Sequence, residues 1–246
     1  MLRAQDRGWR GRLIWNAVFG IAFGYVEAAV VVYLRALYYP GGFAFPLKAI
    51  PTGMIGVEVF REAATIVMLV AVGVLTCRGR WGRFGAFLVA FGVWDISFYL
   101  WLMALVRWPS SLFDWDILFL IPVPWIGPVV AAAIIALVMI VGGCWLVMME
   151  SRGSGVAMTW QSFAAGVIGT VALLYSFMYD TDATLRGAMP RAYPYWMLIV
   201  GTLGYIAGFG LLGRRSAPSD GNSVFGESQG AKLEGRSEEP PLDGER

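Results

Sequence analysis

Long uncharged stretches recur along this chain of 246 residues, and they limit what it can fold into. A bilayer core is about 30 Å thick, so a helix needs about 20 mostly apolar residues to cross it. The composition agrees, with 58% hydrophobic and only 15% charged residues. The sequence therefore predicts an all-α, polytopic membrane protein with about six transmembrane helices, at residues 13–33, 53–76, 84–106, 128–149, 161–178 and 193–212.

Basic residues fall unevenly on the two sides of these spans, which predicts their orientation. Lys and Arg that flank membrane spans accumulate on the cytoplasmic side. With the N-terminus inside, the cytoplasmic segments hold Arg3, Arg7, Arg10, Arg12, Arg78, Arg80, Arg83, Arg152, Arg214 and Arg215, and the outer segments hold Arg35, Lys48, Arg107, Arg186 and Arg191. We therefore expect both termini in the cytoplasm, and the pattern favours a bacterial cytoplasmic (inner) membrane.

Composition divides the chain into three regions. Residues 1–12 form a basic cytoplasmic N-terminus, and residues 13–212 form the transmembrane domain. From residue 213 to residue 246 the chain is rich in Ser, Gly, Pro, Glu and Asp, with almost no large apolar side chain to bury. This acidic cytoplasmic tail is predicted to be disordered.

Several kinds of chemistry are excluded by residues that the chain lacks. It has no histidine, which excludes His-ligated haem, His-dependent zinc and His as a catalytic base. Lys48 and Lys232 both lie outside the spans, so no Schiff base forms within the bundle, and no phosphate-binding loop is present. Cys77 and Cys144 lie near cytoplasmic helix ends, where thiols stay reduced. The scattered arginines do not favour nucleic acid as a partner.

Charged residues inside the predicted spans are the best guide to function. Glu58, Arg61 and Glu62 are spaced i, i+3 and i+4, so they share one helix face. Fourteen uncharged residues separate Glu27 from Arg12, and fourteen separate Glu62 from Cys77, which puts both carboxyl groups at one level, about 21 Å from the inner edge. Asp95 lies nearer the middle of the membrane. Ionisable groups in a spanning helix are costly and usually functional.

This set is too acidic to persist without neutralisation. Arg61 is the one base against Glu27, Glu58, Glu62 and Asp95. The remaining charge requires bound protons, a bound cation, or outer arginines turned inward, namely Arg35 and Arg107. A purely architectural role is the alternative, in which Arg61 ties the first three helices together through its planar fork of donors.

Two outer connections are unusually apolar, at residues 38–48 and 108–128. In the second, Pro122, Pro124 and Pro128 prevent regular helix. Irregular backbone at membrane depth is tolerated only against protein or a watery cavity. We therefore expect this segment to fold back over the outer helix ends as a re-entrant or interfacial cap. The alternative is a belt at the head groups, formed by Trp101, Trp108, Trp115 and Trp125.

Two Asp-x-Asp pairs lie on the outer side, Asp114 with Asp116 and Asp180 with Asp182. Such oxygens can hold a hard divalent cation, although a solvated turn is the commoner role. The prediction assigns no metal site and no cofactor, and leaves protons or a divalent cation as candidates. Approach of Asp116 to Glu27 would favour the cation.

Small residues at helix-packing spacing occur in the first span, at Gly20 and Gly24, and in the last, at Gly204 and Gly208. They permit close backbone approach to another helix, in the same chain, in a second copy or in a membrane partner.

Three classes of function remain open from the sequence. The first is binding or transport of a small solute or lipid through an outward-facing acidic and arginine-containing cavity, with proton or cation coupling. The second is a membrane enzyme acting on a lipid-linked substrate at the outer leaflet, and the third is a structural subunit of a membrane complex. No catalytic residue is assigned; the candidates for binding a ligand or protons are Glu27, Glu58, Arg61, Glu62, Asp95, Asp116 and Arg35.

Overall fold

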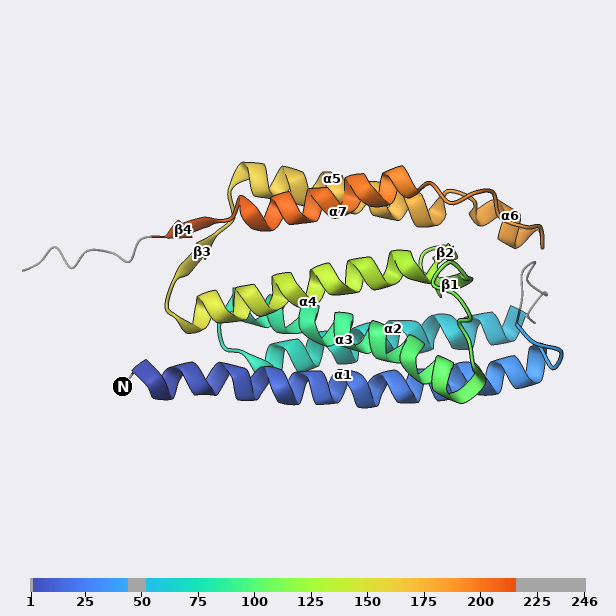
Figure 1. Cartoon of the computed structure of the whole chain (residues 1–246), viewed down its shortest axis with the longest axis horizontal. Helices are drawn as coiled ribbons and strands as arrows, with labels where there is room; N and C mark the ends of the chain where they lie inside the picture. Colours follow the sequence, from blue (N-terminus) through green and yellow to red (C-terminus); the bar gives the residue numbers. More distant parts are fainter. Residues whose placement is uncertain (1, 44–51, 216–246) are drawn as a thin grey trace, which may run out of the picture. The chain divides into compact units, whose positions relative to one another are not determined.

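The computed structural model describes residues 2–43 and 52–215, and it is mostly helical (Figure 1). The six predicted stretches are all helices: α1 (Leu2–Tyr38), α2 (Thr52–Thr76), α3 (Arg80–Val106), α4 (Val129–Ser151), α5 (Trp160–Met178) and α7 (Tyr195–Gly210). A short helix, α6 (Thr181–Leu185), follows α5. Residues 44–51, which include part of the first apolar connection, and the tail from residue 216 lie outside the described residues.

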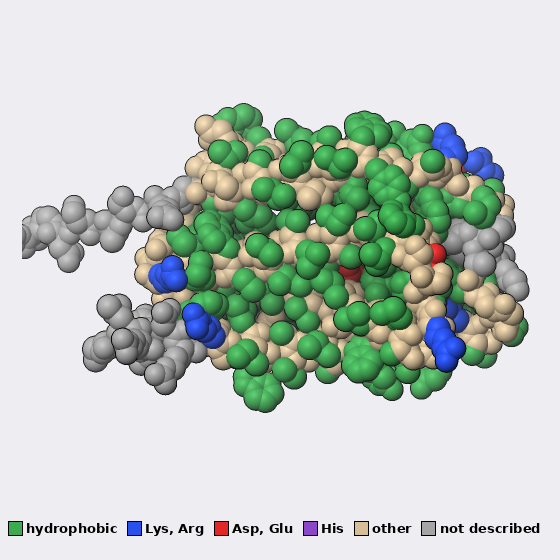
Figure 2. Space-filling view, in the orientation of Figure 1, with side chains coloured by type: hydrophobic (Ala, Val, Ile, Leu, Met, Phe, Trp, Pro, Cys, Tyr) green, Lys and Arg blue, Asp and Glu red, His purple; other side chains and the backbone are tan. Residues whose placement is uncertain are grey.

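Within the described part of the chain, five helices are long and apolar enough to cross a membrane. The sixth, α7, has 16 residues and therefore rises about 24 Å, less than the core of a typical bilayer. Large apolar side chains point away from the protein on several helices: Trp15, Phe60 and Leu75 are 74%, 78% and 84% exposed. Figure 2 shows the resulting apolar surface along the helices, with basic side chains gathered at the two ends.

Helix α3 holds the first four helices together, because it packs against α1, α2 and α4. Its contact with α4 is close enough to require glycine on both sides. A Cβ atom on Gly85 would lie 2.7 Å from the carbonyl oxygen of Gly143, and one on Gly143 would lie 2.4 Å from that of Gly85. Helix α5 packs mainly against α7, and the two run side by side in Figure 1.

A half-buried carboxylate fixes the start of α3. Glu150, at the end of α4, accepts hydrogen bonds from the backbone N–H groups of Gly79 and Gly82, at 3.1 and 2.7 Å. The first N–H groups of a helix have no partner within it, and the positive end of the helix dipole favours an anion there. Glu150 thus joins the α3 and α4 ends on the predicted cytoplasmic side.

Four short strands were not expected from the all-α prediction. Strands β1 (Trp115–Phe119) and β2 (Trp125–Pro128) form an antiparallel hairpin within the second outer connection. Strands β3 (Gly155–Ala157) and β4 (Gly213–Arg215) pair at the other end of the molecule. The prolines do prevent helix, as predicted, but the flanking residues pair as strands instead of remaining irregular. Strand β4 also shows that the first three residues of the predicted disordered tail, 213–215, form a strand.

Both predicted glycine pairs are used for packing within the chain. A Cβ atom on Gly20 or Gly24 would lie 3.0 Å or less from an atom of α3. On the last helix, Gly204 lies equally close to Gly169 of α5, and Gly208 faces the same helix at a slightly greater distance. Intramolecular contacts therefore explain these glycines, and association with a second copy or a membrane partner stays a prediction.

Replacing Gly24 by Ala should lower the thermal unfolding midpoint of the detergent-purified protein. The added Cβ would lie 2.9 Å from the Cβ of Ser97 and 3.0 Å from two α3 backbone atoms, so α1 must move away from α3. The matched control is Gly56→Ala on α2, where nothing lies within 4 Å. Because Ala favours helix over Gly by about 1 kcal/mol, this control should melt at the same temperature or higher. Equal midpoints for the two variants would contradict the close α1–α3 packing.

Candidate functional site

Arg61 on α2 is the central base of a buried charged cluster. Its guanidinium forms an ion pair with Glu27 of α1, and its Nε–H donates to Glu58 at 2.8 Å. The second oxygen of Glu27 accepts a hydrogen bond of 2.7 Å from Thr65, one helical turn beyond Arg61. Both carboxyl groups are almost fully buried, while the Arg61 side chain is 24% exposed. The cluster therefore joins α1 and α2 by charge, where few other contacts join them.

Glu62 connects the same cluster to the hairpin. Its carboxyl group is buried and accepts the backbone N–H of Leu120 at 2.8 Å. Leu120 directly follows β1, where the chain turns toward β2. The apolar outer connection thus folds back against the helices, as the proline pattern predicts, and Glu62 provides an acceptor for a backbone donor that would otherwise be buried without one.

Asp116 of β1 also points into this region. It accepts a hydrogen bond from the Tyr99 hydroxyl at 3.1 Å and lies 3.7 Å from the guanidinium of Arg35. Arg35 in turn lies over the rings of Trp108 and Phe43, at 3.8 and 4.1 Å from their centroids. Asp116 lies outside the membrane-spanning segments; burial raises the pKa of its carboxyl group to about 6, against the lowering effects of Arg35 and Tyr99.

These groups surround a small cavity of about 70 Å³, which we call the acidic cavity. Its walls come from α1, α2, α3 and β1, and they bear Glu27, Arg61, Glu62, Thr65, Trp94, Asp95, Tyr99 and Asp116. A water molecule occupies about 30 Å³ in the liquid, so this space fits a few waters or one small ion. Trp94 is 7% exposed, and its Nε1–H has no partner among the described residues. A buried donor of this kind favours a bound oxygen-containing molecule.

Most of the candidate residues are brought together. Glu27, Arg61, Glu62, Asp95 and Asp116 line the acidic cavity. Glu58 and Arg35 lie outside its wall, and each is held there by an ion pair with a residue of the wall. Inward-turned arginines were one of three alternatives for neutralising the cluster; Arg35 forms an ion pair with Asp116, whereas Arg107, just after the end of α3, is exposed.

The remaining outer carboxylates serve local structure. Asp114 accepts hydrogen bonds from the backbone N–H groups of Ser110 and Ser111 and from the Ser110 hydroxyl. Slight burial raises the pKa of Asp114, but these hydrogen bonds outweigh it and lower the pKa overall. Asp180 forms an ion pair of 3.2 Å with Arg191. Among residues 2–43 and 52–215, no three acidic or cysteine side chains are grouped as metal ligands would be.

Two site residues were missed in the sequence. Thr65 lies four residues after Arg61, on the same face of α2, and Tyr99 lies four residues after Asp95 on α3. The same i, i+4 spacing that places charged residues on one helix face places Thr65 with Arg61 on α2 and Tyr99 with Asp95 on α3. Neither is ionised at neutral pH, so a search for charge within the spans passes over them.

The fold and the charged cluster define a multi-pass membrane protein with a buried acidic cavity near one end of its helices. No family model, curated protein or solved structure matches the chain. Its function is therefore inferred from the site itself.

Replacing Arg61 by Leu should destabilise the protein by about 3 kcal/mol or more. Glu27 and Glu58 would then be buried carboxylates without a base, and breaking a buried pair leaves an uncompensated charge. The double variant Glu27→Gln with Arg61→Leu should be less destabilised than Arg61→Leu alone. Thermal unfolding of wild type, both single variants and the double variant gives the coupling energy. If the losses of stability in the two single variants simply add up in the double variant, a direct interaction between Glu27 and Arg61 is contradicted.

The stability contribution of Asp116 should depend on pH. Its pKa is about 6 in the folded protein and 3.8 ordinarily, so the folded state binds this proton more tightly. The contribution is therefore fully present below pH 3.8 and is lost as the pH rises through 6. Between about pH 5 and about pH 7, the unfolding midpoint of wild type should fall more than that of Asp116→Asn. Exposed Asp182→Asn is the control, and its profile should match that of wild type.

Proposed function

We propose that this protein binds a small solute or lipid from the outer side of the membrane and transports it, with proton or cation binding at the acidic cavity coupled to the process. The observation that carries the proposal is the convergence of four structural elements on the acidic cavity. Five carboxyl groups, counting Glu58, share this region with two guanidinium groups. If all were ionised, three negative charges would be uncompensated.

Protons or a small cation are the neutralising species that this geometry supports. The acidic cavity has room for a small ion but not for a typical metabolite, since ligand pockets are usually about 300–1,000 Å³. A larger solute must therefore meet these groups in another arrangement of the outer segment. The hairpin is the element placed to change, because Glu62 and Arg35 hold it through Leu120 and Asp116. Protonation of a carboxyl group weakens such a contact, which supports coupling between proton uptake and opening.

The orientation of the chain supports an outer entrance. We infer six spans in a bacterial cytoplasmic membrane with both termini in the cytoplasm, because basic residues are concentrated at that side. Helix α7 is short for a span, and tilt of its neighbours or local thinning of the bilayer accommodates such a mismatch at modest cost. In this orientation the acidic cavity lies toward the outer leaflet, beneath the hairpin.

Native mass spectrometry of the purified protein tests the proposal. Wild type should carry a co-purifying small molecule or lipid, and Arg61→Gln and Glu62→Gln should lose it while they remain folded, as judged by their elution as monodisperse protein. Asp182→Asn is the matched control, because it removes an exposed outer carboxylate and should keep the ligand. A ligand-free wild type together with variants that fail to assemble would instead support an architectural role for the cluster.

A further inference from the structure

Asp95 takes no part in the hydrogen bonds and ion pairs around Arg61 in the described part of the chain. It lies at mid-length on α3, and no hydrogen bond or ion pair involves its carboxyl group within the described part of the chain. It lines the acidic cavity and also a second cavity of about 230 Å³. A carboxylate at this depth is costly unless a partner compensates it.

The second cavity is lined by aliphatic side chains together with aromatic rings, and we call it the aromatic groove. It is bounded by α3, the hairpin, α4, α5 and α7, which contribute Phe91, Phe119, Trp125, Phe177 and Tyr205. Neighbouring rings are in contact: centroids are 6.1 Å apart for the tilted pair Phe91 and Phe119, 5.3 Å for the T-shaped pair Phe119 and Trp125, and 6.1 Å for the stacked pair Trp125 and Phe177. Asp95 thus shares this cavity with several aromatic rings.

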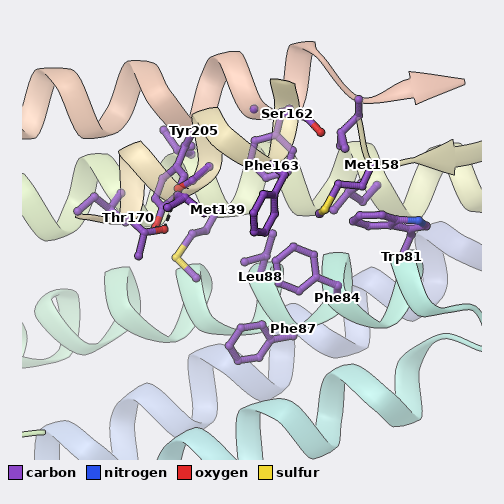
Figure 3. A pocket seen from close by; sticks show the side chains of 18 of the residues that line it. Trp81, Phe84, Phe87, Leu88, Met139, Met158, Ser162, Phe163, Thr170 and Tyr205 are labelled. Carbon is purple, nitrogen blue, oxygen red and sulfur yellow. Dashed lines mark hydrogen bonds between the residues drawn. The ribbon is translucent and has the colours of Figure 1, made fainter. Parts of the chain in front are cut away.

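The aromatic groove continues into a larger apolar cavity of about 560 Å³, shown in Figure 3. The two share Ile135, Met139, Thr170 and Tyr205 as lining residues. From there the larger cavity follows α3 and α5 to Trp81 and Met158, near the predicted cytoplasmic side. In Figure 3, Phe163 and Met158 lie on one side of it and Leu88 and Phe84 on the other. Methionine and aromatic walls adapt readily to different apolar shapes.

The charged residues that line the two cavities indicate which kind of ligand they bind. Of the residues that line the two cavities in the described structure, Asp95 alone is a charged type, and neither Lys nor Arg is among them. A phosphate or carboxylate would therefore meet only an acid. A neutral acyl chain would fill the space but provide no positive charge beside Asp95. A positively charged group would neutralise Asp95 and lie against the aromatic faces, which attract cations.

We propose that the aromatic groove binds a lipophilic organic cation. Its ammonium group lies beside Asp95 among the aromatic rings, and its apolar tail extends into the cavity of Figure 3. The path through the two cavities is bounded by apolar helices, which suits the apolar tail of such a ligand. The inference rests on the proposed function, because it names the class of substrate that this protein binds. Asp95 joins the two sites, since it lines both the aromatic groove and the acidic cavity.

Binding of radiolabelled decyltrimethylammonium to the full-length protein in lipid nanodiscs tests this inference. Wild type should bind the probe saturably, and Asp95→Asn should bind it about 100-fold more weakly, as when a desolvated charge loses its partner. Phe119→Leu should weaken binding about fivefold through loss of a ring face. Asp182→Asn, with its exposed carboxylate, is the control and should match wild type. Unlabelled 1-decanol, which has the same chain without the charge, should compete poorly.

Unchanged binding in Asp95→Asn, absence of saturable binding in wild type, or equal competition by 1-decanol would each overturn the inference; the last result would mean that the groove holds an ordinary lipid tail. Should Asp95→Asn fail to assemble, Phe119→Leu decides: loss of affinity for the cation alone supports the proposal, and equal loss for decanol overturns it. A co-purifying ligand lost in Glu62→Gln, found together with no binding of the ammonium probe, would leave the proposed function standing without this inference.

Discussion

The ion pair between Arg61 and Glu27 is the interaction on which the hairpin end of this protein depends. Helix α2 makes few contacts with α1 other than through these groups, and its large apolar side chains such as Phe60 face outward. In a bilayer there is little hydrophobic drive between helices, because lipid tails are as apolar as Leu. Charge pairing and close packing on α3 therefore fix the position of α2. Once α2 is fixed, Glu62 is in place to hold the hairpin.

The hairpin completes the acidic cavity. Burying its polar backbone groups is unfavourable, and hydrogen bonds with the charged cluster offset this. Strands packed against apolar helices need partners for their backbone groups. Strands β1 and β2 pair with each other, and Glu62 accepts the N–H of Leu120, where the chain leaves β1. Asp116 points inward, where it accepts a hydrogen bond from Tyr99 and pairs with Arg35. The same side chains thus anchor the hairpin and line the cavity, so a change in their charge state bears directly on the contacts that keep the cavity closed.

The sequence predicts the helices well because a bilayer imposes one strong constraint, a continuous apolar stretch of sufficient length. It also predicts that Glu27, Arg61 and Glu62 lie near one another, because these charged residues stand out against uncharged neighbours. It does not predict β1 and β2, since strands of only five and four residues carry no clear period of two. Thr65 and Tyr99 escape notice for a related reason: uncharged polar residues are ordinary in spans, and only their contacts with Glu27 and Asp116 reveal a role.

Asp95 distinguishes between the two roles considered for the charged cluster, a binding site and an architectural network. Arg61, Glu58 and Glu27 satisfy one another, and a purely architectural network of that kind would require nothing more. Asp95 takes part in no such pairing within the described residues, and it adjoins both a polar and an apolar cavity. A side chain that serves only packing at this position would be better apolar, because an uncompensated carboxylate in the membrane is destabilising. Its presence on the wall between two cavities therefore favours a site that binds protons or a cation over an architectural network.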